Sequence, residues 1–443
     1  MESIGKQTKN QAMILQMVTV WMKKRRTSCG SMVGNSLMAQ VVQFFTIAAL
    51  LGMGGSSIAR AGSRTDQALP LFVQDLRAPK IGFLSLNRGM DLEKTLAAID
   101  TAGFVYNSGI LVGAVDQRWI LGMSWNSRKD VWWLDGGTTM TAPPGSFGSH
   151  VLLGFRDGFV KKVEALTGKV VWETRLDSFT ERGFVLSGTK LYVLTAAQIL
   201  HAIDFQSGQI LWVYDGGFPD ALTVRGRTKP LVYDGRIYFG VSTGELVCLD
   251  AQTGKLEWRH QPEFLDGQFH DLVGDLYVRD QNLIFARFDG LVGAMNLVGP
   301  ARNMQWKLEL PSLTTMAVQG GRIYLGGLNG DIFVKNLVDL AKHGVDSSEK
   351  GAEKDVWRYA TGLALATFTV TEDLLVAAGV EGRITALSLS TGELLWHDDL
   401  ASILVTPPLL IDRGLYFLTG LKSLYGYSLY PSIRSAEVLG GRS

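Results

Sequence analysis

The chain alternates apolar and polar residues over short runs, and glycines separate these runs. In one stretch, the run 235–240 (GRIYFG) is followed by 244–250 (GELVCLD) and then by 256–258 (LEW). Alternation with a period of two, rich in β-branched and aromatic residues and bounded by glycine turns, is typical of half-buried β-strands. The pattern therefore predicts three short antiparallel strands joined by tight turns.

The same arrangement recurs along the chain, and its clearest mark is a tryptophan four residues after a glycine. Clear copies are 167–172 (TGKVVW), 207–212 (SGQILW), 253–258 (TGKLEW) and 391–396 (TGELLW). Successive tryptophans lie roughly 40 to 50 residues apart, the period of a four-stranded propeller blade. Because the position repeats, we expect these side chains to be structural anchors that pack between blades: Trp133, Trp172, Trp212, Trp258, Trp306, Trp357 and Trp396.

The repeat predicts an all-β fold, a β-propeller of four-stranded blades spanning residues 75–430. Seven units end in tryptophan, and 403–430 begins an eighth that lacks its last strand. The run 80–86 (KIGFLSL) could supply that strand, so that strands from both termini close the ring and remove an open edge. Eight blades are favoured, with seven as the alternative. The polar stretch 339–355 interrupts the repeat and is expected to be a loop inserted between two strands.

The amino-terminal residues differ from the repeat. Residues 1–61 contain seven basic residues against one acidic residue, and they include a basic patch at 23–26, an apolar run at 44–53 and an A-x-A-like site at 59–61. This order is typical of a cleaved export signal, with an uncleaved anchor as the alternative. We expect 62–74 to be a linker and 431–443 to be a C-terminal tail.

Composition removes several classes of function. The chain after residue 61 is mildly acidic, which gives no electrostatic reason to bind nucleic acid. Two cysteines cannot build a disulfide framework, and Cys248 lies in an apolar run typical of a buried thiol. The six histidines are scattered without the spacing of a zinc site, and there is no calcium loop, phosphate-binding loop or nucleophile elbow. We therefore expect no metal, no cofactor and no enzymatic activity.

The repeat resembles the pyrroloquinoline-quinone-type propeller repeat, and within that superfamily the chain is most similar to the BamB family. Members of that family are propeller subunits of the machinery that folds β-barrels into the Gram-negative outer membrane. The resemblance spans roughly 75–430. It implies a non-catalytic scaffold in the periplasm that binds the periplasmic domains of the barrel-inserting subunit, with unfolded outer-membrane proteins as a second candidate partner.

Two stretches carry the resemblance to the family's docking loops. Residues 221–226 (ALTVRG) resemble a Leu-x-Leu-Arg-Gly loop, which maps a partner-binding role onto Leu222, Val224 and Arg225. Residues 271–276 (DLVGDL) resemble an acidic loop one blade later, and Asp271 keeps its first acid. Val273 and Leu276 replace the second acid and a proline of the family's loop. The alternative for the first stretch is an ordinary strand with a solvated arginine.

Two further differences leave other functions open. Family members are usually held at the outer membrane by a lipidated cysteine after the signal, whereas Cys29 precedes the apolar run here. The chain would then be associated with the membrane through partners or an uncleaved helix. Quinone-dependent alcohol dehydrogenases share the repeat, but this sequence has no adjacent cysteines. A periplasmic sensor or carbohydrate-binding propeller is the third possibility, and it would need exposed aromatic residues at the propeller mouth.

Overall fold

The computed structural model describes residues 80–85, 103–115, 118–217, 228–263, 269–299, 302–310, 312–343, 355–400, 404, 408–412, 414–419 and 423–428. All of these residues belong to the compact unit Gln74–Ser443. The predicted signal or anchor (1–61), linker (62–74) and tail (431–443) lie outside the described residues. Within the described part of the chain, no helix is long and apolar enough to cross a membrane.

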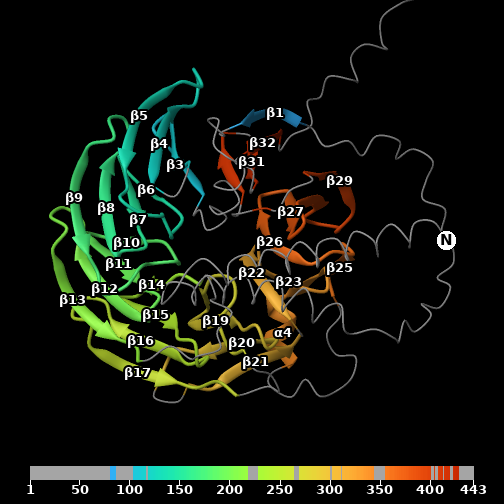
Figure 1. The fold of residues 1–443 in the computed structure, drawn as a ribbon. Coiled ribbons are helices and arrows are strands. Elements are labelled where there is room, and N and C mark those ends of the chain that lie inside the picture. Colours follow the sequence, from blue (N-terminus) through green and yellow to red (C-terminus); the bar gives the residue numbers. More distant parts are fainter. Residues whose placement is uncertain are drawn as a thin grey trace, which may run out of the picture. The chain divides into compact units, whose positions relative to one another are not determined.

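The described residues form eight four-stranded antiparallel sheets, the blades of a β-propeller (Figure 1). Blades 1 to 4 comprise β2 (Phe104–Asn107), β3 (Ile110–Ala114), β4 (Trp119–Ser124), β5 (Asp130–Asp135); β6 (Gly145–Phe147), β7 (His150–Gly154), β8 (Phe159–Glu164), β9 (Val170–Arg175); β10 (Val185–Ser187), β11 (Lys190–Leu194), β12 (Ile199–Asp204), β13 (Ile210–Asp215); and β14 (Leu231–Tyr233), β15 (Arg236–Gly240), β16 (Leu246–Asp250), β17 (Leu256–His260). Blades 5 to 8 comprise β18 (Tyr277–Arg279), β19 (Asn282–Ala286), β20 (Leu291–Asn296), β21 (Met304–Glu309); β22 (Leu313–Gln319), β23 (Arg322–Gly327), β24 (Asp331–Asn336), β25 (Trp357–Ala360); β26 (Leu365–Val370), β27 (Leu374–Gly379), β28 (Arg383–Ser388), β29 (Leu394–Asp399); and β30 (Leu409–Ile411), β31 (Gly414–Leu418), β32 (Ser423–Ser428) with β1 (Lys80–Ser85). The predicted eight-bladed propeller is confirmed.

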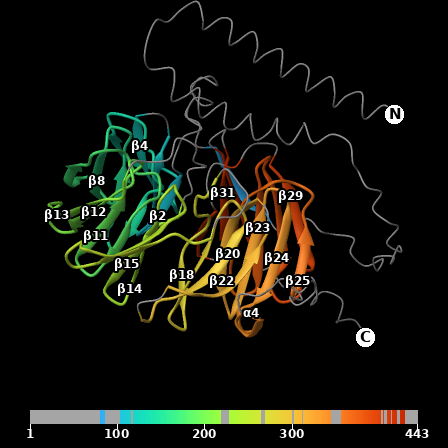
Figure 2. The same cartoon turned by 90° about the horizontal axis from the view of Figure 1, so that it is seen from below.

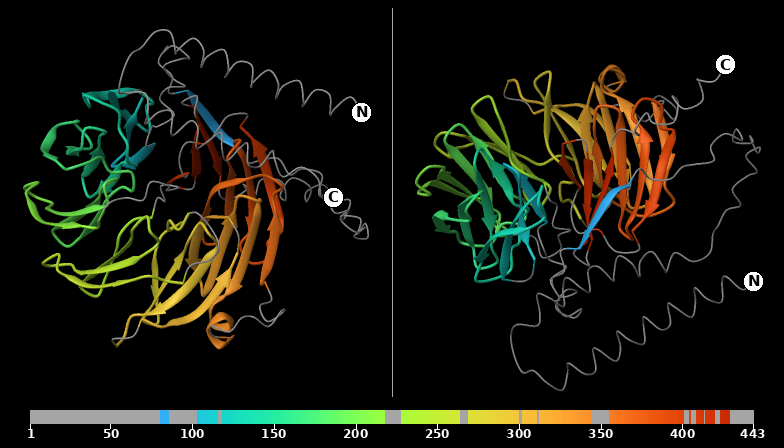
Figure 3. Two further views of the ribbon diagram at one scale, coloured as in Figure 1. Left: turned by 60° about the horizontal axis from the view of Figure 1, so that its bottom comes forward. Right: turned by 90° about the horizontal axis from the view of Figure 1, so that it is seen from above.

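The two ends of the propeller meet in blade 8. Its strand order is β1-β32-β31-β30, so the first strand of the described residues becomes the outer strand of the last blade. Phe83 pairs with Tyr425 in this antiparallel ladder. Figure 3 shows β1 in blue against the red strands from two directions. The predicted closure by strands from both termini is therefore confirmed.

Apolar side chains fill the space between each pair of neighbouring blades. The described residues form eight hydrophobic clusters, and each cluster draws on two adjacent blades. The cluster that joins blade 8 to blade 1 contains Leu418 and Leu111, so the ring has no open side. Seen from below, neighbouring sheets follow one another around the ring (Figure 2). The core is thus a circle of seams rather than a single centre.

Trp172, Trp212 and Trp357 pack into these seams against the glycine turn of the next blade. The ring of Trp172 in blade 2 covers Gly208 in blade 3, where an added Cβ would lie 2.7 Å from it. Its Nε1 donates to the carbonyl of Phe205 in that same turn, at 3.1 Å. Trp212 covers Gly254, and Trp357 covers Gly392, in the same way. The glycines adopt positive φ, which a tight turn needs and which also brings the backbone flat against the indole.

Blade 1 departs from the predicted anchors by one residue. Trp132, not Trp133, occupies the seam: its Nε1 donates to the carbonyl of Ala165 at 2.9 Å, and its ring covers Gly168. Trp133 is 44% exposed, so its expected role as an anchor is wrong. The same β-bulge between the third and fourth strands occurs in blades 1 and 2, and it places Trp132 opposite Gly122 just as Trp172 lies opposite Lys162. In blade 1 the turn position of the glycine is taken by Arg128, with a φ of +57°, and Trp132 is the residue four positions after it.

The other predicted anchors differ in how deeply they are buried. Trp172, Trp306, Trp357 and Trp396 are all less than 10% exposed, whereas Trp212 and Trp258 are half-buried. Trp396 stacks on Tyr427 of blade 8, with ring centroids 5.3 Å apart. Trp258 lies beneath the guanidinium of Arg302, whose Cζ is 4.9 Å from the ring centroid. Each of these contacts crosses from one blade to the next.

In the seam between blades 8 and 1, the tryptophan comes from the second of the two blades instead of the first. Gly82 holds the anchor position in β1, opposite Gly426. The Tyr416 ring occupies the space beside Gly426, because a Cβ on Gly426 would lie 2.4 Å from it. Trp125 of blade 1 then packs edge-on against Tyr416 at 4.8 Å, and the Arg128 guanidinium covers its face at 3.6 Å. The tryptophan of this seam therefore comes from the following blade.

Blade 6 replaces the glycine turn with a short helix, α4 (Leu337–His343). We expected 339–355 to be a loop, and its first residues are helical instead. Leu337 and Leu340 share one face of the helix and pack into the cluster that contains Trp306. The Asn336 side chain accepts the amide of Val338 at 2.9 Å, which caps the first turn. The helix thus covers the tryptophan that a glycine turn covers elsewhere.

Candidate functional site at the connections of blades 3 to 5

Three of the four predicted partner-binding residues, Leu222, Val224 and Arg225, lie outside the described residues. They belong to the connection between β13 and β14, which leads from the outer strand of blade 3 to the inner strand of blade 4. Asp271 lies in the equivalent connection between β17 and β18. Because each blade repeats the same strand order, these connections leave the ring at the same end and on neighbouring blades.

Asp271 is an internal residue. It is 1% exposed, so its carboxylate acts inside the protein and does not form an exposed contact of the kind that the resemblance implied. Its backbone carbonyl accepts the amide of Phe288 at 2.9 Å, which joins the connection to the turn between β19 and β20. Burial of this acid indicates a role in shaping the connection.

Arg182 interacts with Asp271 from the connection that leads into blade 3. It lies in the connection before β10, and its Nη1 donates to the carbonyl of Gly240 in blade 4 at 3.3 Å. Burial lowers the pKa of Arg182, and the negative charges of Asp271 and Glu181 act in the opposite direction. One guanidinium therefore links three successive blades, through a hydrogen bond to blade 4 and through its attraction to an acid of blade 5.

A second buried charge lies beside Asp271. The side chains of Arg287 and Asp289 are both fully buried and form an ion pair in the turn between β19 and β20. Arg287 Nε donates to Asp289 Oδ1 at 3.1 Å, and its Nη2 donates to the carbonyl of Glu263 at 2.8 Å. Asp289 Oδ2 also contacts His270 Nδ1 at 3.0 Å. The pair thus touches the β17–β18 connection at Glu263 and at His270.

Exposed ion pairs surround this buried cluster. Arg259 Nη2 lies 2.6 Å from Glu245 Oε2, and Lys307 Nζ lies 2.8 Å from Glu263 Oε2. Such exposed pairs add little to stability but give the surface a fixed pattern of charge. The end of the ring at blades 4 and 5 therefore combines a rigid buried network with a charged rim.

Two observations describe the polar groups that could take part in chemistry. Among the described residues, no group of three or more His, Cys, Asp or Glu could hold a metal ion. His201 contacts Asp177, but the hydroxyl of Thr195 bonds to the same carboxylate at 3.2 Å. Hydroxyl and imidazole thus share an acid instead of contacting each other, which is not the order of a nucleophile, base and acid relay.

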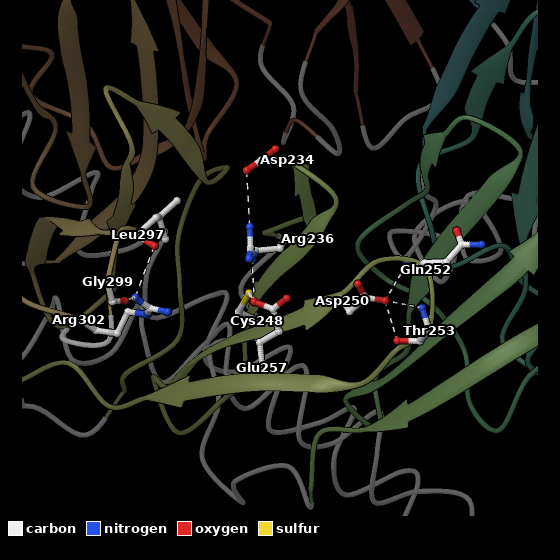
Figure 4. A network of polar contacts seen from close by, with 10 residues as sticks. All are labelled: Asp234, Arg236, Cys248, Asp250, Gln252, Thr253, Glu257, Leu297, Gly299 and Arg302. Carbon is white, nitrogen blue, oxygen red and sulfur yellow. Dashed lines mark hydrogen bonds and ion pairs between the residues drawn. The ribbon is translucent and has the colours of Figure 1, made fainter.

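The opposite end of the ring carries a separate polar network in blades 4 and 5 (Figure 4). Arg236 Nε donates to Glu257 Oε2 at 2.7 Å, beside the buried thiol of Cys248. Burial raises the pKa of Cys248 to about 12, and the charge of Glu257 adds to the effect. The thiol is therefore protonated at neutral pH, as expected for a structural cysteine.

The sequence did not point to Arg182, Arg287 or Asp289. A signal was present for Arg287, because the segment 287–290 (RFDG) aligns with 155–158 (FRDG) in blade 2 and places a charge where that blade has Phe155. The equivalence of Arg287 and Phe155 becomes clear only when the blades are aligned on their backbone hydrogen bonds.

Comparisons with known proteins fit this architecture. The family model described as outer membrane protein assembly factor BamB matches residues 111–334 and 343–429, well over half of the chain. The chain is 27% identical over 204 residues to the outer membrane protein assembly factor BamB of Yersinia pestis, which covers 45% of this chain and 50% of that protein. The chain therefore spans about half the length of this relative.

Two further likenesses concern the fold and the repeat. The crystal structure of BamB from Moraxella catarrhalis superposes with a TM-score of 0.64 at 18% identity, covering 79% of this chain and 99% of that one. The dehydrogenase subunit of a quinone alcohol dehydrogenase from Gluconacetobacter polyoxogenes is 34% identical over 100 residues. That stretch covers 20% of this chain and 13% of the dehydrogenase, so the likeness is confined to a few repeats.

Proposed function

Because the chain belongs to the family of the outer membrane protein assembly factor BamB, we propose that it is a non-catalytic scaffold that assists the assembly of outer-membrane β-barrel proteins. It would work in the periplasm, associated with the outer membrane, and bind the periplasmic domains of the barrel-inserting subunit. The observation that carries this proposal is the family match, which extends over blades 1 to 8.

The proposed contact surface is the end of the ring formed by the connections of blades 3 to 5. Leu222, Val224 and Arg225 would supply the exposed contacts, since an arginine ringed by apolar side chains makes a compact docking site. Asp271 would act from the interior, where its negative charge favours the charged form of Arg182. A rigid platform favours such docking because less conformational entropy is lost on binding.

Binding measurements with the purified periplasmic domains of the barrel-inserting subunit test the proposal. We expect Leu222→Asp and Arg225→Ala each to weaken binding by roughly 1–3 kcal/mol and to leave the thermal midpoint nearly unchanged. Leu166→Asp is the matched control, because Leu166 is 52% exposed in a turn at the opposite end of the ring. Equal binding by all three variants and the parent would refute the proposed surface.

The local likeness to a quinone alcohol dehydrogenase favours one alternative, a quinone-binding enzyme. We expect the purified protein to show neither saturable binding of pyrroloquinoline quinone in the presence of Ca²⁺ nor dye-linked alcohol oxidation. Stoichiometric binding of the quinone in a titration would support the alternative. Affinity purification from envelope extracts, followed by mass spectrometry, separates the two functions, because only the scaffold should retain the barrel-inserting subunit.

A further inference from the structure

Arg287 is a charged residue at a turn position that holds uncharged residues in blades 1 to 4. In the turn after the second strand, one residue donates its amide to the carbonyl four residues later, and this bond identifies the equivalent position in blades 1 to 5. The residues at that position are Val115, Phe155, Thr195, Val241 and Arg287. Four of the five are uncharged, so this position accepts an uncharged side chain. A fully buried charge at a position that the fold fills with uncharged residues calls for a reason other than folding.

The acid of the pair is a normal part of the turn. Asp289 Oδ1 accepts the amide of Leu291, and Asp157 Oδ1 accepts the amide of Phe159 at the same point in blade 2. Asp157 has no arginine at the equivalent position, because Phe155 stands there. The arginine is therefore the addition, and its extra contacts show what it adds.

Those contacts bring three segments together. Arg287 Nη2 holds the carbonyl of Glu263, and Asp289 holds His270, so the connection between β17 and β18 is fixed at both points. The turn of blade 4 presses on the same group: a Cβ on Gly244 would lie 2.8 Å from the Cβ of His270 and 3.3 Å from Arg287 Nη1. The ion pair thus joins its own turn, the connection and the neighbouring blade.

Stability alone does not explain the pair. Burying two charges costs desolvation energy, and apolar residues of similar size usually serve folding equally well or better. What apolar residues cannot do is fix a backbone carbonyl and an imidazole in one geometry, because that requires directional hydrogen bonds. The cluster is suited to specifying the shape of the connection.

We propose that the Arg287–Asp289 pair is a positioning device that, together with His270, holds residues 269–276, the described part of the β17–β18 connection next to β18, in a docking-competent shape. The proposal rests on the proposed function for its link to partner binding, whereas the positioning itself concerns only this chain. In the absence of the pair, the connection would sample several shapes, and the partner would meet a binding-competent platform only part of the time.

The test is a double variant, Arg287→Met with Asp289→Asn, which removes both charges without leaving one of them buried and unpaired. The matched control carries Phe155→Met and Asp157→Asn, the same two positions in blade 2. Amide hydrogen exchange, the thermal midpoint and affinity for the periplasmic domains of the barrel-inserting subunit are measured on both variants and on the parent.

We expect the blade 5 variant to keep a thermal midpoint within a few degrees of the parent, to exchange the amides of 269–276 at least tenfold faster and to bind at least tenfold more weakly. The blade 2 control should keep the parent's exchange in 269–276 and its affinity. Unchanged exchange in 269–276 would overturn the proposal whether or not a partner binds. Faster exchange with unchanged affinity would overturn the link to docking. A parent that binds no barrel-inserting subunit would refute the proposed function, and the exchange data would still decide the positioning role.

Discussion

Replacing Gly208 with alanine probes the contact that the blades repeat. Gly208 lies in the turn between β12 and β13, has a φ of +77° and lies beneath the indole of Trp172. An alanine there must adopt a left-handed backbone, which costs about 1–2 kcal/mol. Its Cβ would also lie 2.7 Å from the Trp172 ring, closer than real Cβ contacts allow. Either the indole or the turn must move.

The steric clash with Trp172 distinguishes Gly208 from other glycines that also have a positive φ. The Trp172 ring fills the seam between blades 2 and 3, so its displacement forces an overpacked core, at about 1–3 kcal/mol. Gly188, in the same blade, has a φ of +60° and open space around its missing Cβ. Gly188→Ala should therefore cost only the backbone part, about 1–2 kcal/mol, whereas Gly208→Ala should cost about 2–5 kcal/mol in total.

Chemical denaturation followed by tryptophan fluorescence measures both variants against the parent. We expect the midpoint to fall for both and to fall further for Gly208→Ala, with an altered native-state emission spectrum that reports the moved indole. Equal losses for the two variants would refute the reasoning, because the steric part would then be absent and the tryptophan would not be seated on the turn.

Four further outcomes are expected. Tyr192→Phe should change the free energy of unfolding by less than about 1 kcal/mol. The Tyr192 hydroxyl donates to the carbonyl of Ala251 at 2.8 Å, and the buried Nε1 of Trp212 has no partner among the described residues. Once the hydroxyl is removed, the Ala251 carbonyl can accept a hydrogen bond from Trp212 Nε1 instead. Tyr427→Phe, which loses a 2.8 Å bond to Asp398, should cost about 1.5–3 kcal/mol in the same denaturation assay, and equal costs would contradict this account. Burial, with a contribution from Arg302, lowers the pKa of His260 below its usual 6.5. The unfolded chain therefore binds the proton more readily, and the free energy of unfolding falls as the pH drops below about 6.5. Thermal midpoints at pH 7.5 and 5.5 should show this loss of stability, and His260→Gln should reduce it. Deletion of residues 80–86 should lower the thermal midpoint and promote self-association in size-exclusion chromatography, since β32 would then expose an unpaired edge, and an unchanged monomer would count against the closure.

Most of the fold could be predicted from the sequence, because each repeat is marked by residues that lie close together in the chain. Glycine turns, alternating strands and the tryptophan period predicted four-stranded blades, and the run 80–86 predicted the closing strand. Trp133 was chosen over Trp132 because Arg128 stands in blade 1 where the other turns have glycine, so the Gly-to-Trp spacing that marks the anchor is hidden there. Helix α4 was missed because its two buried leucines stand in a polar stretch, and their partner Trp306 lies on another blade.

The candidate site was less accessible to sequence reasoning. Asp271 was singled out through its place in a loop motif, yet a motif does not show that a carboxylate is 1% exposed. Arg182 and Arg287 make their contacts with residues of other blades or of distant loops, and such contacts follow from the three-dimensional ring alone. Leu222, Val224 and Arg225 remain predictions.

The closing strand also affects the kinetics of folding. Blades 1 to 7 each consist of strands that follow one another in the chain, so their hairpins can form over short loops and fold early. Blade 8 must wait, because the ladder that pairs Lys80 with Tyr427 joins the two ends of the propeller. Ring closure is thus the step with the greatest loop-closure entropy and the natural candidate for the slowest folding phase. In the reverse direction, unfolding should start by separation of β1 from β32, so a crosslink across this ladder would slow unfolding more than one placed within any other blade.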